Sequence, residues 1–210
     1  SKSVTPRRPQ HGLIMCRTLS SSGASPQQGG GGLTIYGFQF SQPTRSLLML
    51  CEANDIPYNF EVVDALKGQN RKPAFRKEFP SGQVPVIKDG DFRLFETPAI
   101  LAYICGKYKV TNTWYPMDDL TKRAQVDAWM HWHHAHSRIA TKMVLHAKLF
   151  PTLPGQSEKW TQGNKQLKHV LAHLEDTLSS RPFLTGDDVT IADLLIVAEF
   201  DQHRQEVTGL

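Results

Sequence analysis

The sequence predicts a mixed α/β domain followed by an all-helical domain. From Leu33 to about position 110, short β-rich runs alternate with helical runs, a pattern typical of a small sheet covered by helices. After "TNTWYPMDDL", a linker by composition, no strand-like run returns and apolar residues recur at helical spacing. We therefore expect a tail with a glycine linker (1–32), an α/β domain (33–110), a linker (111–120) and an all-α helical bundle domain (121–210).

The α/β half begins with "LTIYGF" (33–38), a short β-rich run that predicts a strand. Apolar residues at helical spacing then predict a helix over about 44–54. "YNFEVVD" (58–64) is a second strand candidate, and the polar "KGQNRK" (67–72) ends it. The order so far is strand, helix, strand and loop.

A hairpin and a helix complete this half. In "VPVIKDGDFRLFE" (84–96), Asp89-Gly90 separates two apolar segments, which is a strong hairpin signal. Pro85 is unusual inside a strand because it lacks a donor for the ladder; either a cis Val84-Pro85 bond or a strand that starts at this proline explains it. A helix over about 97–108 follows, with a proline in its favoured first turn.

The second half predicts helices only. Residues 121–150 form one long helix-compatible stretch, and residues 162–180 form another. In the latter, five apolar residues fall on one predicted face: Leu167, Val170, Leu171, Leu174 and Leu178. A further helix starts at Thr190, where Asp193 three residues later makes a near capping box of structural role. The chain stops at Leu210 just after this helix, so we expect a final element to follow.

The bulk composition indicates a soluble globular protein. Of 210 residues, 40% are hydrophobic and no apolar run approaches membrane-spanning length, so we expect no membrane partner. Four residues of the tail, Lys2, Arg7, Arg8 and Arg17, carry the whole formal charge of +4. Removing these four from the 24 basic residues leaves 20, against 20 acidic residues. We therefore expect no nucleic-acid partner.

Cysteine use and the tail bear on the compartment. Cys16, Cys51 and Cys105 are too few and scattered for a disulfide framework, and no Cys-x-x-Cys pair offers a zinc or dithiol site. A reducing compartment follows, and we expect the cytoplasm. Residues 1–32 are rich in Ser, Gly, Pro and Arg and free of acid. We expect them to be disordered, either as a dispensable tail or as a transit segment to a mitochondrion or plastid.

Ser41 places a lone hydroxyl at the turn from the first strand into the first helix, within "YGFQFSQPTRSLLML" (36–50). Two roles fit this position. The hydroxyl can cap the helix N-terminus, which is the commoner role for such a serine. It can also hold a reactive anion there, through a charge-assisted hydrogen bond at the positive end of the helix dipole.

Five motifs occur in an order known from one family: "SQPTR" (41–45), "ALKGQN" (65–70), "GQVPVIKDGDF" (82–92), "FETPAILAYI" (95–104) and "FLTGDDVTIADLL" (183–195). From Leu33 onward, the chain thereby resembles a cytosolic glutathione transferase, nearest the theta class. The resemblance implies a thioredoxin-like N-terminal domain, an all-α C-terminal domain and homodimers. It also implies an enzyme that conjugates the thiol of glutathione, a co-substrate, to electrophiles without any further cofactor.

The resemblance implies roles for residues in these motifs. Ser41 matches the catalytic serine that stabilises the glutathione thiolate, and together with the flanking motifs this favours catalysis over capping. Glu96 and Thr97 match the pair that binds the ammonium and carboxylate of the γ-glutamyl end. The backbone of Val84, presented by a cis Pro85, would pair with the cysteinyl portion as a strand does.

Two positions depart from the family pattern. Theta-like proteins usually have a histidine at position 70 and a lysine at position 83, both facing the glycyl carboxylate, whereas this chain has Asn70 and Gln83. Both can still donate hydrogen bonds, but a charged donor is about twice as strong. We therefore expect glutathione binding at both positions with weakened contacts.

The histidine-rich "WMHWHHAHSR" (129–138) contains two pairs at helical spacing, His131 with His134 and His133 with His136. Such pairs suit zinc or nickel, but no third ligand is close, so we expect no metal site. In the resembling fold this helix borders the electrophile cleft. Trp132, His136 and Arg138 are therefore candidates to line it, with core packing or a solvated face as the alternative.

We expect a glutathione transferase that acts on small apolar electrophiles, with reduction of organic peroxides as a neighbouring activity. A non-catalytic docking or dimerisation module is one alternative, because the same fold serves that purpose in translation factors and synthetases. A carrier of apolar ligands is another, and it would not need Ser41. Fold alone does not separate these functions.

Overall fold

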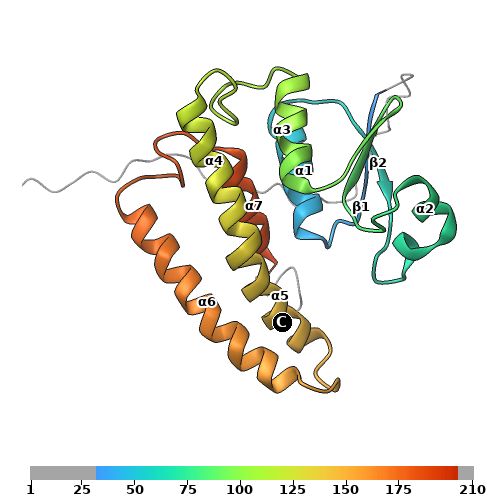
Figure 1. The fold of residues 1–210 in the computed structure, drawn as a ribbon, viewed down its shortest axis with the longest axis vertical. Coiled ribbons are helices and arrows are strands. Elements are labelled where there is room, and N and C mark those ends of the chain that lie inside the picture. Colours follow the sequence, from blue (N-terminus) through green and yellow to red (C-terminus); the bar gives the residue numbers. More distant parts are fainter. Residues whose placement is uncertain (1–31, 203–210) are drawn as a thin grey trace, which may run out of the picture.

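A computed structural model describes residues 32–202 (Figure 1). Residues 1–31 of the predicted tail (1–32) and the last eight residues lie outside this range. The first half contains β1 (Leu33–Gly37), α1 (Gln42–Ala53), β2 (Asn59–Val62), the 3₁₀ turn η1 (Gln69–Arg71), α2 (Pro73–Glu78), β3 (Val86–Asp89), β4 (Phe92–Leu94) and α3 (Thr97–Lys107). The second contains α4 (Leu120–Trp132), the π turn η2 (His133–Ser137), α5 (Arg138–Leu149), α6 (Gln156–Ser179) and α7 (Ile191–Asp201).

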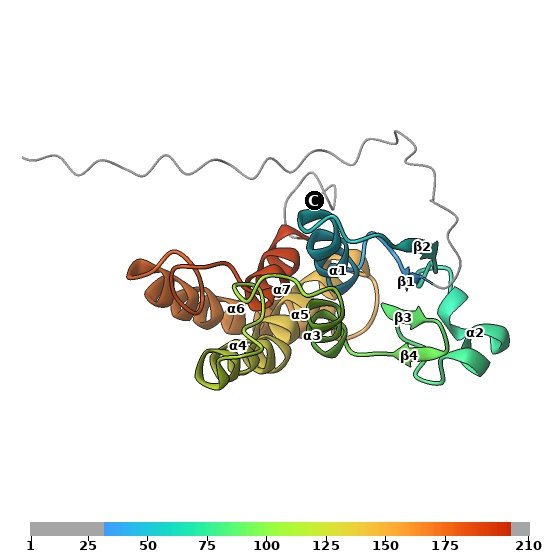
Figure 2. The ribbon, with the colours of Figure 1, turned by 90° about the horizontal axis from the view of Figure 1, so that it is seen from above.

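The four strands form one mixed sheet in the order β2-β1-β3-β4. β1 runs parallel to β2 and antiparallel to β3, and β3 runs antiparallel to β4. α1 and α3 cover the sheet face that looks toward the helical half, and α2 lies on the other side (Figures 1 and 2). This βαβαββα order is the expected thioredoxin-like arrangement.

The core of the first half follows from the apolar pattern. Leu33 and Ile35 alternate inward on β1, while Leu47 and Leu50 face the sheet from α1, and all four are fully buried. The hairpin at Asp89-Gly90 and the helix that starts at Thr97 are confirmed, and the Val84-Pro85 peptide bond is cis.

The sequence prediction missed η1 and α2. A single 3₁₀ turn and a six-residue helix are too short to establish a helical period in the sequence. α2 packs instead through aromatic contacts: the Phe79 ring lies 5.1 Å from that of Tyr36 and 5.1 Å from that of Phe75.

The second half is helical throughout, as predicted. α4, η2 and α5 follow one another without a loop, and α6 packs along α5 (Figure 1). The predicted apolar face of α6 is partly wrong, because Leu171 and Leu178 are exposed whereas Gly163 and Thr177 are buried. The inward stripe therefore mixes small and polar residues with leucines. None of the helices within residues 32–202 is both long and apolar enough to cross a bilayer.

α7 joins the two halves by packing directly against α1 (Figure 2). The predicted capping box at its start is confirmed: the Asp193 carboxylate accepts hydrogen bonds from the backbone N–H and the hydroxyl of Thr190, each at 2.8 Å. The same carboxylate accepts from the backbone N–H of Leu184 at 2.9 Å, which ties the preceding loop to the helix.

Candidate functional site

Three segments of the first half end at one edge of the sheet. Tyr36, near the end of β1, pairs with Val86, the first residue of antiparallel β3. Ile87 in turn pairs with Leu94, the last residue of β4. The chain therefore leaves β1 toward Ser41, enters β3 from Val84-Pro85, and leaves β4 toward Glu96 and Thr97 at the same edge. The sheet register alone brings these predicted site residues together.

Ser41 is the N-cap residue of α1 by position, with extended backbone (φ −78°, ψ 121°). Its carbonyl accepts the first bond of the helix, from the backbone N–H of Arg45 at 3.1 Å. Its hydroxyl makes no capping hydrogen bond among the residues described. The side chain is half-buried at the positive end of a 12-residue helix, where a developing anion is stabilised.

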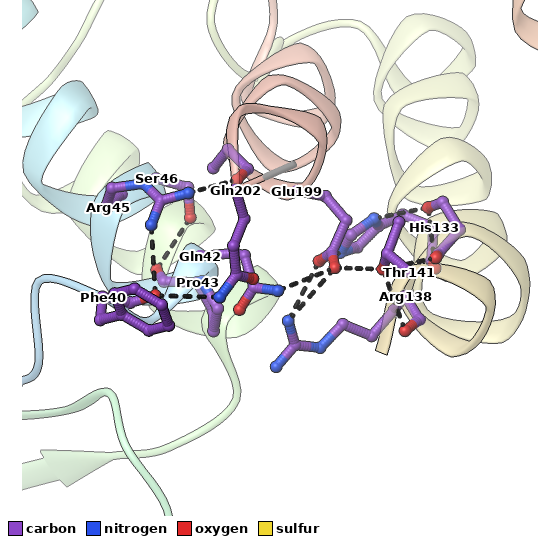
Figure 3. A network of polar contacts seen from close by, with 12 residues as sticks. Phe40, Gln42, Pro43, Arg45, Ser46, His133, Arg138, Thr141, Glu199 and Gln202 are labelled. Atoms are coloured by element: carbon purple, nitrogen blue, oxygen red, sulfur yellow. Dashed lines mark hydrogen bonds and ion pairs between the residues drawn. The ribbon is translucent and has the colours of Figure 1, made fainter. Parts of the chain in front are cut away.

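The turn that carries Ser41 is held by side chains from both halves. Arg45 donates from Nη1 to the carbonyl oxygen of Phe40 at 3.2 Å and from Nη2 to that of Ala198 on α7 at 2.7 Å. Gln202, just after α7, also donates to the Phe40 carbonyl, at 3.3 Å. The docking of α7 thus holds the Phe40 carbonyl, which directly precedes Ser41 in the chain (Figure 3).

Gly37 lets the end of β1 approach the first turn of α1. A Cβ atom added at Gly37 would lie 2.5 Å from Cγ2 and 2.9 Å from Oγ1 of Thr44, which is fully buried. The Thr44 hydroxyl also accepts a hydrogen bond from the backbone N–H of Phe38 at 3.4 Å. The close approach therefore needs glycine, and it sets the turn between Phe38 and Ser41.

Glu96 and Thr97 start α3 at the same edge. Glu96 has a positive φ of 67°, an uncommon conformation for a residue with a side chain and one that clusters at functional sites. This backbone holds the Glu96 carboxylate out in solvent, and that carboxylate makes no capping bond among the described residues. Thr97 is buried at the first helical position, where its backbone N–H has no helical acceptor.

The remaining predicted residues lie on the loop before β3, except Asn70, which lies in η1. Val84 is half-buried and Pro85 is buried, whereas Gln83 is exposed. Asn70 donates from Nδ2 to the carbonyl oxygen of Gly82 at 2.7 Å. Its Oδ1 is buried without a hydrogen-bond partner in the described part of the chain. Asn70 thus braces the loop that carries Gln83, a role its sequence position did not reveal.

A buried carboxylate that the sequence analysis missed is hydrogen-bonded to Gln42, the residue after Ser41. Glu199 on α7 is only 1% exposed and accepts a hydrogen bond from Nε2 of Gln42, the residue after Ser41, at 3.1 Å. Arg138 donates to it at 3.1 Å, and the hydroxyl of Thr141 donates to its other oxygen (Figure 3). The only sequence signal was a glutamate inside the apolar run "IADLLIVAEF" (191–200).

His133 completes this group of side chains. Its Nε2 lies 3.8 Å from Oε2 of Glu199, and its Nδ1 lies 2.8 Å from Oγ of Ser137. Burial lowers the pKa of His133 to about 4, an effect that outweighs the attraction of Glu199. The imidazole is therefore neutral at physiological pH, and Arg138 supplies the positive charge that compensates Glu199.

The three residues predicted to line an electrophile cleft lie on two faces of the helical stretch. Arg138 reaches α7, whereas Trp132 and His136 line a separate cavity of about 310 Å³ against α6. Their rings stack with centroids 5.4 Å apart. No residue of α1, β3 or α3 lines this cavity. Of the three, only Arg138 shares a hydrogen-bond partner with α1, since Arg138 and Gln42 both donate to Glu199.

Of the two predicted histidine pairs, His133 and His136 differ in burial. His133 is buried toward Glu199, whereas His131, His134 and His136 are exposed. Within residues 32–202, no three His, Cys, Asp or Glu side chains cluster in a way that suits a metal ion.

Comparison with known proteins extends over both halves. The model of the glutathione S-transferase N-terminal domain matches residues 31–106, and that of the C-terminal domain matches residues 140–209. Human glutathione S-transferase theta-1 is 39% identical over 173 residues, which is 80% of this chain and 72% of that protein. Mouse glutathione S-transferase theta-2 is also 39% identical, over 81% of this chain and 71% of that protein.

Solved structures agree with these matches. The apo form of human glutathione S-transferase T1-1 superposes with a TM-score of 0.75 at 38% identity, covering 81% of this chain and 73% of that one. Human glutathione transferase theta-2, in complex with glutathione and an unknown ligand, gives a TM-score of 0.77 at 36% identity, covering 82% of this chain and 72% of that one.

Proposed function

This chain belongs to the glutathione S-transferase family, and from that premise we propose that it conjugates the glutathione thiolate to small apolar electrophiles, with Ser41 stabilising the thiolate. The observation that carries the proposal is the Ser41 hydroxyl, half-buried at the start of α1 and not used for capping among the described residues. A serine that served only as a cap would point this hydroxyl at the backbone of its own helix.

The free energy that a hydroxyl and a helix N-terminus contribute is sufficient to ionise the bound thiol. A free thiol has a pKa of about 8.5, so only a few per cent is thiolate at neutral pH. Lowering that pKa by about two units requires about 2.7 kcal/mol. A hydrogen bond to a charged group contributes about 1.5–3 kcal/mol, and a helix N-terminus adds about 0.3–1 kcal/mol. One hydroxyl at the start of α1 can therefore ionise the bound thiol.

The remaining contacts follow from the charges of glutathione. The exposed Glu96 carboxylate is free to pair with the γ-glutamyl ammonium, while the hydroxyl and backbone N–H of Thr97 meet the carboxylate at the start of α3. The Val84 backbone pairs with the cysteinyl portion in strand fashion. Gln83 and the remaining amide hydrogen of Asn70 serve the glycyl carboxylate, and Arg138 borders the electrophile.

One observation favours a non-catalytic binding module instead. Asn70 already donates one amide hydrogen to the Gly82 carbonyl. Neither Asn70 nor Gln83 brings a positive charge to the glycyl end of glutathione. Weak glutathione binding with an unshifted thiol pKa would support that alternative, whereas an ionised thiol supports the transferase.

We further propose that the protein acts in the cytoplasm as a homodimer. Phe92 at the start of β4 and Phe95 just after its end are 45% and 57% exposed, and exposed aromatic residues are common at interfaces between subunits. Cys51 and Cys105 are free and buried, which suits a reducing compartment. Sedimentation of the full chain, compared with a Phe95→Asp variant, tests the dimer.

The catalytic proposal is tested by steady-state transfer of glutathione to an activated aryl halide. We expect Ser41→Ala to lower kcat/KM by about 100-fold or more, because it removes the donor to the developing anion. The matched control is Ser46→Ala, which removes a buried hydroxyl from the same helix, one that donates only to the Pro43 carbonyl. Equal activities of the two variants would contradict the role of Ser41.

A further inference from the structure

Glu199 is a buried acid with no part in the chemistry proposed above. Its carboxylate receives hydrogen bonds from three directions: Gln42 on α1, Arg138 at the start of α5, and Thr141 one turn later. Two of these groups lie at the candidate site. Gln42 is bonded covalently to Ser41, and the Arg138 guanidinium extends from the helical half toward Gln42 (Figure 3). The Glu199 side chain thus links the start of α1 to the Arg138 guanidinium across the domain boundary.

The π turn η2 shapes the helical side of this group. His133 and Arg138, five residues apart, would lie about 140° apart around an ideal α-helix. The wider π turn brings both of them, together with Thr141, to the same carboxylate. Single π turns of this kind are frequent at functional sites. The widened turn therefore has a specific structural effect, which is to aim Arg138 at α7 and α1.

The negative charge of Glu199 is balanced by one positive charge, that of Arg138. His133 is neutral because it is buried, and Gln42 and Thr141 are neutral donors, so Arg138 alone compensates the carboxylate. The Arg138 side chain is 30% exposed, so one face of its guanidinium remains open. A guanidinium presents five donors, and a single carboxylate does not consume them all.

From these contacts we propose that Glu199 is a positioning residue, which fixes Gln42 and Arg138 so that the Ser41 hydroxyl and a guanidinium face the same bound thiolate. The proposal rests on the proposed catalytic role of Ser41. Glu199 touches neither substrate nor reacting atoms. Its effect reaches them through the residue after Ser41 and through Arg138, and it makes the geometry of the start of α1 depend on the docking of α7.

Two substitutions of Glu199 distinguish its role in positioning Gln42 and Arg138 from a direct effect of its negative charge on the thiolate. Glu199→Gln keeps the length of the side chain and removes its charge, and its amide group opposes the Arg138 donor. Glu199→Asp keeps the charge but is one methylene too short to reach both helices. We would titrate the thiolate absorbance of glutathione bound to each variant of the 210-residue chain and measure kcat/KM with the aryl halide.

Positioning predicts that both variants raise the pKa of the bound thiol, by about half a unit, and lower kcat/KM by about tenfold. If Glu199 acted only through its charge, Glu199→Gln would lower the thiol pKa, because a nearby negative charge disfavours a thiolate, and Glu199→Asp would leave it unchanged. Either of those results overturns the proposal.

Two further variants test whether Glu199 acts only by stabilising the fold. Gln42→Met removes the donor from α1 without leaving Glu199 uncompensated, and positioning predicts that it too raises the thiol pKa. Leu195→Val, a core truncation one turn before Glu199 on α7 that leaves the carboxylate and its donors in place, is the control for lost stability alone. An unshifted thiol pKa in both Glu199 variants and Gln42→Met, with a shifted one in Ser41→Ala, would refute the inference while the proposed function stands. An unshifted thiol in the unmodified protein would refute the proposed function itself.

Discussion

Replacement of Gly37 by alanine tests how closely α1 must approach the sheet to present Ser41. The new Cβ would lie 2.5 Å from Cγ2 of Thr44, whereas ordinary contacts begin near 3.4 Å. The first turn of α1 or the end of β1 must therefore shift by about 0.9 Å. Thr44 is fully buried and has no space into which to rotate.

The expected loss of stability follows from two opposing effects. Overpacking of a well-packed core costs about 1–3 kcal/mol. Replacing glycine by alanine restricts the unfolded chain, which returns about 0.4–1 kcal/mol. We therefore expect Gly37→Ala to lower the free energy of unfolding by about 1–2 kcal/mol, measured by urea denaturation. A misplacement of about 1 Å can cost about 100-fold in rate. We therefore also expect kcat/KM to fall, and to fall even under conditions in which the variant remains fully folded.

Two further variants complete this test. Thr44→Ala removes both atoms nearest the new Cβ, so the double variant should recover part of the loss, which a double-mutant cycle would detect as coupling. Gly106→Ala on α3 is the control, because its nearest neighbour, the Met117 Cε atom, lies 3.7 Å away. Unchanged stability and activity of Gly37→Ala, or an additive cycle, would refute the reasoning.

Three other predictions concern single side chains. Burial lowers the pKa of His133 to about 4 in the folded protein, against about 6.5 in the unfolded chain. The protein should therefore lose about 3 kcal/mol of stability as the pH falls from 6.5 to 4, and denaturation at several pH values should show that His133→Asn lacks this loss. Burial opposes ionisation of Asp89, but hydrogen bonds from Lys107 and Tyr103 hold its pKa below the usual value; its stabilisation should therefore be present above pH ~4 and lost below it, and Asp89→Asn should flatten that loss. Glu96→Gln should weaken glutathione binding by about tenfold in calorimetry without changing the Tm, and unchanged affinity would rule out the ammonium contact.

Local signals in the sequence predicted most of the sheet and the long helices. The Asp89-Gly90 hairpin and the Thr190–Asp193 capping box depend on residues a few positions apart, which is why both were predictable. α2 was missed because six residues do not establish a period. Leu171 and Leu178 were misassigned because burial on α6 depends on what packs there, and small or polar residues fill part of that contact.

The candidate site divides in the same way. Ser41, Glu96 and Thr97 were predicted from short motifs and the resemblance that these motifs carry, and the sheet register brings their segments to one edge. Glu199 lies 157 residues from the Gln42 amide that it accepts, so only the folded chain reveals the contact. Trp132 and His136 were grouped with Arg138 because the helix that carries them borders the electrophile cleft in the resembling fold, but they line a cavity against α6 and the π turn lies between Trp132 and Arg138.

The most direct test of the account is the pKa of the glutathione thiol when bound, read from thiolate absorbance across pH for the unmodified protein and for Ser41→Ala. We predict a bound thiol that ionises about two units below its free value, and a return toward about 8.5 in Ser41→Ala while Ser46→Ala keeps the shift. Bound glutathione with an unshifted thiol, or the same shift with and without the Ser41 hydroxyl, would contradict the account.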